Sequence, residues 1–232
     1  MLTVDHASVS VQDLPVVRDV SFAVHAGQAV GITGANGAGK TTLARAISGL
    51  ARLTMGSVCL TGSDGPTRLD TLPPWAVARR GVVYVAEERN VFGEFSVREN
   101  LDSALLASQV DRARRAQLCA RIGTYFPFLL TRLHQRASSL SGGERKILSI
   151  ARAIMAIWAR QDAQVSPSQV LVLDEPTHGL HPVMSDKVKA LLDETRQTGV
   201  AVVIMEEKPA FLTGLTAVCW LIRNGSLDRR LW

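Results

Sequence analysis

GANGAGKT, residues 34–41, is the stretch from which the architecture of this chain can be inferred. It fits the pattern G-x-x-x-x-G-K-S/T, follows the apolar run QAVGIT at 28–33 and precedes the helical stretch TTLARAISGL at 41–50. Glycines in such a loop let backbone amides curl around phosphate oxygens, and the N-terminus of the next helix attracts anions. A plain glycine-rich turn is the alternative, but the order strand, loop, helix favours a phosphate-binding loop.

The side chains of this loop suggest what it holds. Lys40 can reach the β- and γ-phosphates of a nucleotide, and the hydroxyl of Thr41 can ligate Mg²⁺. The residues expected to bind the nucleotide here are Gly34, Asn36, Gly37, Ala38, Gly39, Lys40, Thr41 and Thr42. Mg²⁺ is therefore an expected cofactor together with the nucleotide.

Composition describes a chain with one globular core. The 232 residues are 47% hydrophobic, and the net charge of +5 is mild, so a solvated basic face is favoured over a nucleic-acid surface. The sequence lacks an apolar run of the roughly 18 residues that span a bilayer, and its N-terminus does not resemble a signal peptide. Three widely spaced cysteines suggest a reducing compartment without a disulfide framework. We expect a cytoplasmic protein that can still dock on a membrane.

The rest of the chain alternates between short strands and helices. Strands are predicted at 2–11, 16–24, 28–33, 57–60, 82–85, 169–174 and 200–205, and helices at 41–50, 96–107, 111–126, from 142 onward, and at 182–197. Ser96 and Glu99 form a capping-box pattern at the first helix of the middle region. The predicted fold class is α/β: a P-loop NTPase core with an N-terminal antiparallel β lobe and a helical subdomain inserted at about 90–160.

A second candidate site follows the apolar run QVLVLDE, residues 169–175. A buried strand that ends in an acid presents its carboxylate at the edge of the sheet where α/β proteins bind ligands. Asp174 is expected to hold Mg²⁺ through water, and Glu175 to polarise the water that attacks the γ-phosphate. An apolar run before two acids is weak alone, and it gains weight from the phosphate loop upstream.

SLSGGERK, residues 139–146, places two adjacent glycines where a helix should begin. Glycine is a poor helix former, so Gly142 and Gly143 suggest that something approaches the backbone closely. Ser141 could add a hydroxyl donor to a phosphate at this helix N-terminus. The alternative is an ordinary helix start with Ser141 as the N-cap.

These motifs, in this order, resemble the ATP-binding cassette (ABC) family of transporter ATPases, and the resemblance covers nearly the whole chain. It implies one nucleotide-binding domain over residues 1–232, ATP and Mg²⁺ as cofactors, and ATP hydrolysis with Glu175 and Lys40 as catalytic residues. In that family two cassettes pack head to tail. The family's signature motif, here Ser141, Gly142, Gly143 and Glu144, then contacts the γ-phosphate that the other cassette holds.

Two further stretches resemble the ATPase subunits of branched-chain amino-acid importers and of urea and short-amide importers. They are LPPWAVARRGVVYVAEERNVFGEFSVRENL at 72–101 and DEPTHGLHP at 174–182. The resemblance makes Glu87 a third catalytic candidate, near the γ-phosphate. His178 and His181 could be metal ligands, but the absence of a third ligand nearby in the sequence favours ordinary loop residues.

The resemblance also implies partners and a location. Expected partners are a second ABC ATPase subunit, a paralogue being favoured over a second copy, integral membrane permease subunits and, indirectly, a solute-binding protein. Nucleic acid is not an expected partner, because relatives that bind it carry long coiled coils or two cassettes in one chain. The expected location is the cytoplasmic face of the inner membrane, where the subunit is peripheral.

Three departures from the family pattern leave an alternative open. The position of the aromatic residue that stacks on adenine is taken by Ser10 and Val11, and the switch histidine is replaced by Glu207. Residues 155–169 are longer than the usual link and are interpreted as an extended loop. Val11 and Glu207 suggest an alternative to an active ATPase, namely an ATP-binding partner cassette that hydrolyses slowly.

Overall fold

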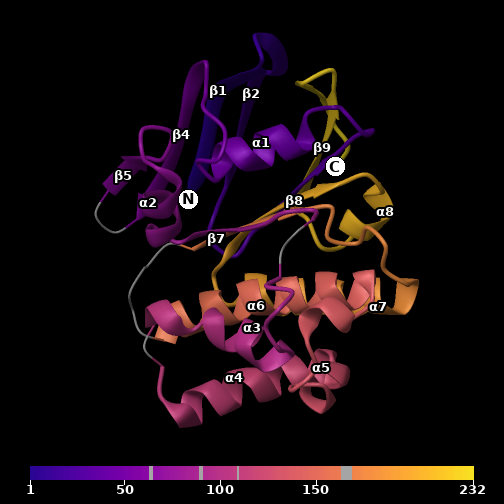
Figure 1. Ribbon diagram of the computed structural model, residues 1–232. Helices are drawn as coiled ribbons and strands as arrows, with labels where there is room; N and C mark the ends of the chain where they lie inside the picture. The colour runs from indigo at the N-terminus through magenta and orange to yellow at the C-terminus, as the bar shows by residue number, and fades with distance from the viewer. Residues whose placement is uncertain (63–64, 89–90, 109, 163–168) are drawn as a thin grey trace. The chain divides into compact units, whose positions relative to one another are not determined.

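The computed structural model describes residues 1–62, 65–88, 91–108, 110–162 and 169–232 (Figure 1). The chain divides into two compact units. The first unit comprises Met1–Tyr84, Ser168–Glu175 and Leu192–Trp232, and the second comprises Val85–Pro167 and Pro176–Leu191. The chain therefore leaves the first unit twice and returns to it twice, so the second unit is inserted into the sequence of the first.

The N-terminal part of the first unit is a four-stranded antiparallel sheet in the order β2-β1-β4-β5. Its strands are β1 (Leu2–Val11), β2 (Leu14–Val24), β4 (Met55–Gly62) and β5 (Gly65–Arg68). Alternating apolar residues of β1, such as Leu2 and Val4, are buried on one face, as a half-buried strand requires. The expected antiparallel β lobe is thus confirmed.

A six-stranded sheet in the order β10-β9-β3-β8-β7-β6 completes the first unit. Its strands are β3 (Ala29–Thr33), β6 (Val82–Val85), β7 (Val170–Asp174), β8 (Ala201–Glu206), β9 (Val218–Arg223) and β10 (Ser226–Arg230). β8 pairs in parallel with β3 and β7, and every residue of these three strands is buried. Their carboxyl ends meet at one edge, because Thr33 pairs with Glu206 and Asp174 with Met205.

Short helices complete the first unit: α1 (Lys40–Ile47), α2 (Pro74–Arg79) and α8 (Pro209–Leu212). Helix α1 packs against β1, β2, β7 and β8, so it contacts both sheets (Figure 1). Leu43, Ala44 and Ile47 of α1 are fully buried in the shared core. The start of α1, which the phosphate loop precedes, is therefore held in place by both sheets.

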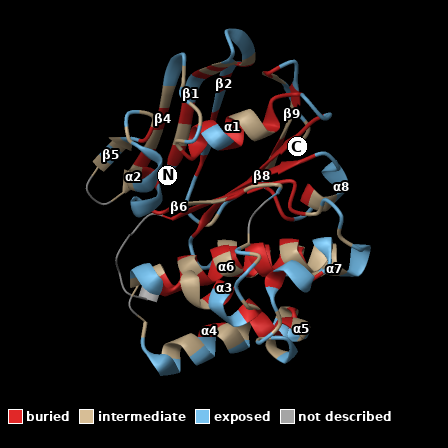
Figure 2. Cartoon of the chain, in the orientation of Figure 1, coloured by how far each residue is buried: buried red, intermediate tan, exposed pale blue. Residues whose placement is uncertain are grey.

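The second unit is helical. Its elements are α3 (Val97–Ser103), η1 (Leu106–Ser108), α4 (Arg112–Tyr125), α5 (Pro127–Thr131), η2 (Ala137–Ser139) and α6 (Gly142–Asp162), and α7 (Pro182–Gln197) begins in it. Helix α3 starts with the expected capping box of Ser96 and Glu99. Helix α6 contacts α3 and α4 through a face that is buried along most of its length (Figure 2). None of the helices traced in the described ranges is long and apolar enough to cross a bilayer.

Two predictions for this unit need correction. The helix expected at 96–107 is divided into α3 and η1, because Leu105 and Ser108 bond to carbonyls three residues back instead of four. The loop expected at 155–169 is helical as far as Asp162, since Met155, Ile157 and Trp158 continue the buried face of α6. Residues 163–168, where the rest of that loop was expected, lie outside the described residues.

Alanine substitutions at two glycines of the β lobe would distinguish the cost of backbone strain from the cost of steric overlap. Gly56 and Gly65 both have positive φ, +81° and +95°. A Cβ on Gly56 would overlap the carbonyl oxygens of Asp5 and His6, whereas a Cβ on Gly65 meets nothing within 4 Å. We expect Gly65→Ala to cost about 1 kcal/mol of unfolding free energy, and Gly56→Ala at least about 2 kcal/mol more. Denaturant unfolding of both variants is the measurement, and equal costs would contradict the steric explanation.

Candidate functional site

The loop at 34–39 connects β3 to α1, and its glycines give it a backbone that bends sharply. Gly37 and Gly39 have φ of +78° and +106°, values that glycine adopts readily. A Cβ on Gly39 would come within 2.9 Å of the carbonyl oxygen of Val16, whereas a Cβ on Gly37 would meet nothing within 4 Å. Helix α1 has no side-chain cap and no acidic residue in its first turn. Its first N–H groups therefore remain available to a phosphate.

Lys40 is buried at the start of α1, and its side chain folds over the loop. The ammonium is part of a side chain only 5% exposed, and it donates to the carbonyl oxygens of Gly34 at 2.6 Å and Ala35 at 3.1 Å. It also forms an ion pair with Glu175, with Nζ 3.0 Å from Oε1. Because a buried ammonium is costly without partners, these three contacts hold it beside the loop.

The other predicted loop residues lie where the motif requires, with different exposure. Asn36 is exposed, Ala38 is buried, and Thr41 and Thr42 are half-buried in the first turn of α1. The carbonyl of Ala38 accepts a hydrogen bond from Gly225, which ties the loop to the turn between β9 and β10. The hydrogen bond from Gly225 thus supports one side of the loop, while Asn36 and Gly37 face solvent.

Asp174 and Glu175 stand at the end of β7, at the edge where β3 and β8 also end. Asp174 is fully buried, and the phenol of Tyr84 donates to its Oδ2 at 3.2 Å. Burial and the charge of Asp174 raise the pKa of Tyr84, so this phenol keeps its proton and remains a donor. Glu175 has φ of +48°, an uncommon conformation for a residue with a side chain and one that is found often at active sites.

The carboxylate of Glu175 has several partners in the first unit. Burial acts to raise its pKa, but hydrogen bonds with Glu206, Lys40 and the backbone N–H of Glu207 lower that pKa overall. The Glu207 N–H donates to Glu175 Oε2 at 3.1 Å and to Glu206 Oε1 at 3.0 Å. Glu175 is therefore ionised and acts as an acceptor.

Sequence reasoning identified Glu207 as the residue in the place of a switch histidine and missed Glu206. The side chain of Glu207 is exposed, and its contact with Glu175 runs through the backbone. Glu206 is 2% exposed, and its side chain hydrogen-bonds with Glu175. The signal was present, because the apolar run of β8 ends in an acid as β7 does.

The residues present fit a magnesium ion. Thr41 supplies a hydroxyl near the start of α1, and Asp174 supplies a buried carboxylate at the shared strand edge. Such oxygen donors are the ligands that Mg²⁺ prefers, and Mg²⁺ is commonly held by one or two side chains together with phosphates and water. Elsewhere in the described ranges, His178 and His181 do not join a group of three or more metal-binding side chains.

The signature motif lies at the start of α6, in the second unit. The Ser141 Oγ accepts a hydrogen bond from the N–H of Glu144 at 3.2 Å, and Glu144 Oε2 accepts from the N–H of Ser141 at 3.0 Å. Arg132 also pairs with Glu144 at 2.8 Å, and these contacts lower the pKa of the Glu144 carboxyl. The capping alternative therefore describes this helix start, and the Ser141 hydroxyl also hydrogen-bonds with the Glu144 carboxylate.

The surroundings of Gly142 and Gly143 differ, so the presence of glycine at these two positions has different explanations. A Cβ on Gly143 would come within 3.2 Å of the carbonyl oxygen of Gly179 and 3.3 Å of Leu180 Cδ2, so the packing of the second unit itself disfavours a side chain there. A Cβ on Gly142 would meet nothing within 4 Å. Nothing in the described chain accounts for a glycine at 142, which is consistent with an approach from outside.

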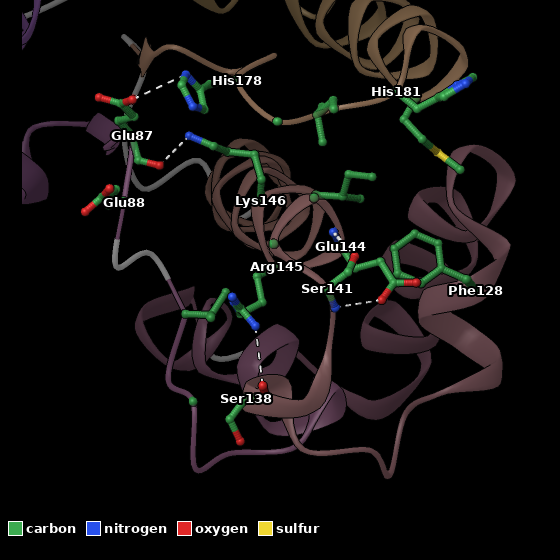
Figure 3. Close-up of a pocket in the computed structure, with 18 of the residues that line it drawn as sticks. Glu87, Glu88, Phe128, Ser138, Ser141, Glu144, Arg145, Lys146, His178 and His181 are labelled. Atoms are coloured by element: carbon green, nitrogen blue, oxygen red, sulfur yellow. Dashed lines mark hydrogen bonds and ion pairs between the residues drawn. The ribbon is translucent and has the colours of Figure 1, made fainter.

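Both glycines line a hollow of about 1220 Å³ within the second unit, called here the signature hollow (Figure 3). Glu87, the third catalytic candidate, lines it too. The carbonyl oxygen of Glu87 accepts from Lys146 Nζ at 2.5 Å, and its carboxylate lies 3.5 Å from His178 Nδ1. The predicted residues thus form two groups: Lys40, Thr41, Asp174 and Glu175 in the first unit, and Glu87 with Ser141–Glu144 in the second.

A glycine loop between the buried strand β3 and a helix, with two acids at the end of β7 in the same sheet, defines a P-loop NTPase fold. Residues 17–178 match the ABC transporter family. The high-affinity branched-chain amino acid transport ATP-binding protein BraG of Pseudomonas aeruginosa is 31% identical over 98% of this chain and 91% of its own length. The lipopolysaccharide export system ATP-binding protein LptB of Haemophilus influenzae is 32% identical over 89% of this chain and 80% of its own length.

Solved structures agree on the fold. An ATP-binding subunit of an ABC transporter superposes with a TM-score of 0.83, at 23% identity over 99% of this chain and 89% of that one. A bacterial ABC transporter cassette solved as a dimer gives a TM-score of 0.82, at 19% identity over 99% and 97%. The chain belongs to the ABC transporter family and is an ATP-hydrolysing transporter subunit. The family, fold and enzyme class inferred from the sequence are confirmed.

The two signature glycines should respond differently to a methyl group. Gly142→Ala should leave the unfolding free energy unchanged or raise it by up to about 1 kcal/mol, because alanine favours the helix and the methyl enters open space. Gly143→Ala should lose that gain, because its methyl presses on the Gly179 carbonyl. Denaturant unfolding compares the two, and a loss of stability in Gly142→Ala equal to that in Gly143→Ala would contradict the assignment.

The Lys40–Glu175 pair should be visible in the stability of the nucleotide-free protein. Lys40→Ala leaves the Glu175 carboxylate buried without its cation, and we expect a loss of about 3 kcal/mol. Adding Glu175→Gln removes the unpaired charge and should recover part of this loss. A double-mutant cycle from denaturant unfolding measures the coupling. Additive effects of the two substitutions would show that the pair does not stabilise the fold.

Proposed function

We propose that this chain drives an importer of branched-chain amino acids or related amino acids and amides. The observation that carries the cargo class is the match to BraG over almost the full length of both chains. The match to LptB, whose name indicates export, covers less of both chains, although its identity is similar. The acid at Glu87 and the stretch at 174–182 also favour the importer subfamily.

In the proposed mechanism, the amides of the loop and Lys40 bind the phosphates of ATP. Thr41 and Asp174 hold Mg²⁺, which neutralises charge on the phosphate oxygens when bound. Glu175 orients the attacking water and accepts its proton as the bond from the γ-phosphorus to ADP breaks. Both units together would form one nucleotide-binding cassette over residues 1–232.

The ion pair adds a requirement to this mechanism. The Lys40 ammonium donates to the carbonyls of Gly34 and Ala35 and lies 3.0 Å from the carboxylate of Glu175. A phosphate that binds this ammonium competes with these three groups. If the phosphate displaces the Glu175 carboxylate from Lys40, Glu175 becomes free to act as the base when ATP binds. The N–H of Glu207 would still hold the other oxygen of that carboxylate.

A second cassette would complete the site. We assign Ser141, Gly142, Gly143 and Glu144 to contacts with ATP that is held by the phosphate loop of the partner. The open space at Gly142 supports this role, and the signature hollow is large enough for a nucleotide. The partner is a paralogue in this proposal, and the two cassettes pack head to tail.

The membrane partners would contact the segment that follows Glu87. Phe92 and Phe95 are 50% and 46% exposed, and their rings lie 5.2 Å apart. Exposed aromatic residues beside each other often mark an interface. We assign this pair to an integral membrane permease, through which a solute-binding protein acts indirectly. The cassette is then peripheral on the cytoplasmic face of the inner membrane.

A cassette that binds ATP but hydrolyses it slowly is the second candidate. It is favoured by Glu207, whose exposed side chain replaces the histidine of the family pattern. An ionised carboxylate cannot donate a hydrogen bond to the γ-phosphate. The intact Lys40–Glu175 pair argues against this candidate.

Reconstitution with the co-purifying membrane subunits tests both candidates. ATP turnover and uptake of labelled leucine are measured for the unmodified complex and for Glu175→Gln. The importer proposal expects solute-stimulated turnover that Glu175→Gln lowers by at least about a hundredfold. Turnover that Glu175→Gln leaves unchanged would favour the slow cassette, and turnover without amino-acid or amide uptake would reject the proposed cargo.

Ser141→Arg tests the contact in trans. The arginine fills the space that the partner's γ-phosphate must enter, so hydrolysis at that composite site should fall by at least about tenfold. ATP affinity of the isolated variant should stay unchanged, because Lys40 and Thr41 are untouched. Thr124→Arg, on an exposed position of α4 outside the signature hollow, is the matched control. Loss of ATP affinity in the isolated, folded Ser141→Arg variant would contradict a contact in trans.

A further inference from the structure

A second hollow lies within the second unit and shares no lining residue with the signature hollow. It has a volume of about 390 Å³ and is lined by residues of α3, α4 and the segment from α5 to Leu133. We propose that this hollow, called here the arginine groove, binds a small organic anion: a carboxylate that carries a short aliphatic chain. Its volume is at the lower end of the range for small-molecule sites.

The floor of the arginine groove suits an aliphatic chain. Leu101 is fully buried, and Leu130 and Leu133 are half-buried. Ala116 and Ala120, one turn apart on α4, also line the groove, and their short side chains leave room in it. A chain of a few methylene or methyl groups would gain about 0.8 kcal/mol for each group that it buries.

The rim of the groove is positively charged without sufficient acids to balance it. Arg115 pairs with Asp102 at 3.2 Å. Arg98 and Arg112 also line the groove, and no carboxylate in the described ranges pairs with either. Two guanidinium groups beside an apolar floor are complementary to a carboxylate with an apolar body.

The N-terminus of α4, the helix that carries Arg112, adds positive charge to the rim of the groove. Arg112, Arg114 and Arg115 all lie in the first turn of α4, which has no acidic residue. The N-terminus of a helix already carries partial positive charge, so arginines are unfavourable there unless an anion compensates them. Asp111, the N-cap, supplies one negative charge to this end by accepting from the N–H of Arg114 at 2.7 Å. The remaining positive charge favours an added anion.

Cys119 provides a direct probe, because its half-buried thiol lines the groove. Alkylation by iodoacetamide at mildly alkaline pH is followed by peptide mass on the full chain, and Cys59 in the β lobe is the internal control. 4-Methylpentanoate should slow alkylation of Cys119 by about tenfold at ten times its Kd and leave Cys59 unaffected. Isoamylamine, with the same chain but a positive charge, and acetate, with the charge but no chain, should not protect.

Four variants locate the ligand. Arg98→Gln and Arg112→Gln should each weaken the protection by 4-methylpentanoate by at least about tenfold in Kd. Ala116→Phe should fill the groove and abolish ligand-dependent protection, whereas Ala113→Phe, on the same helix but outside the groove, should not. L-Leucine tests whether the ligand is an amino acid or a simple carboxylate. Protection by leucine means that Asp102 accommodates an ammonium group. Protection by 4-methylpentanoate alone restricts the ligand to simple carboxylates.

Three results would overturn the proposal. Equal protection by isoamylamine would show that the charge is irrelevant, and equal protection by acetate would show that only an unspecific anion binds. Protection by 4-methylpentanoate that is undiminished in both arginine variants would place the ligand elsewhere. Circular dichroism of each variant establishes that it is folded before its alkylation rate is interpreted.

Discussion

The buried ion pair between Lys40 and Glu175 is the interaction on which the candidate site of this chain depends. It joins the helix that begins at Lys40 to the strand that ends before Glu175, across the edge where β3, β7 and β8 terminate. Neither charge could remain buried alone, because the desolvation cost of an isolated charge is several kcal/mol. The fold therefore has to bring the phosphate loop and the acidic end of β7 together, because neither charge is stable in the core without the other.

Much of this arrangement could be predicted because its constraints are local. A glycine loop needs a strand before it and a helix after it, and a buried parallel strand is apolar until it reaches the ligand edge. The pattern at 34–41 and the run at 169–175 carry these constraints in consecutive residues. The antiparallel lobe, the P-loop core and the inserted helices follow from the same periodicities.

What the sequence did not reveal depends on contacts between distant segments. Glu206 faces Glu175 because β8 lies between β3 and β7, an order that no local pattern specifies. Gly143 is a glycine because the carbonyl of Gly179 lies against it, and Gly142 shows no such contact. Helix α6 continues to Asp162 because Met155 and Trp158 are buried. The length of the segment alone does not indicate this burial.

Ser141 caps the start of α6 and is also the first residue of the signature motif. Ser141 accepts from Glu144 N–H, which satisfies an N–H of the first turn and fixes the position of its hydroxyl oxygen. The hydroxyl also hydrogen-bonds with the Glu144 carboxylate and so helps to lower the pKa of Glu144. In the proposed contact with a partner's phosphate, the phosphate would replace this carboxylate as the acceptor of the Ser141 hydroxyl.

Val11 shows where nucleotide binding must obtain its free energy. It is 49% exposed and stands where the family pattern has an aromatic ring, and stacking on a base is typically worth about 1–3 kcal/mol. Without that ring, the loop amides, Lys40 and the oxygen donors for Mg²⁺ have to supply most of the affinity in the proposed mechanism. Because these groups all act on phosphates, the cassette would distinguish ATP from ADP more strongly than one purine from another. A subunit whose affinity depends on the γ-phosphate in this way releases its hold when that phosphate is removed, which is the property that a transport cycle requires.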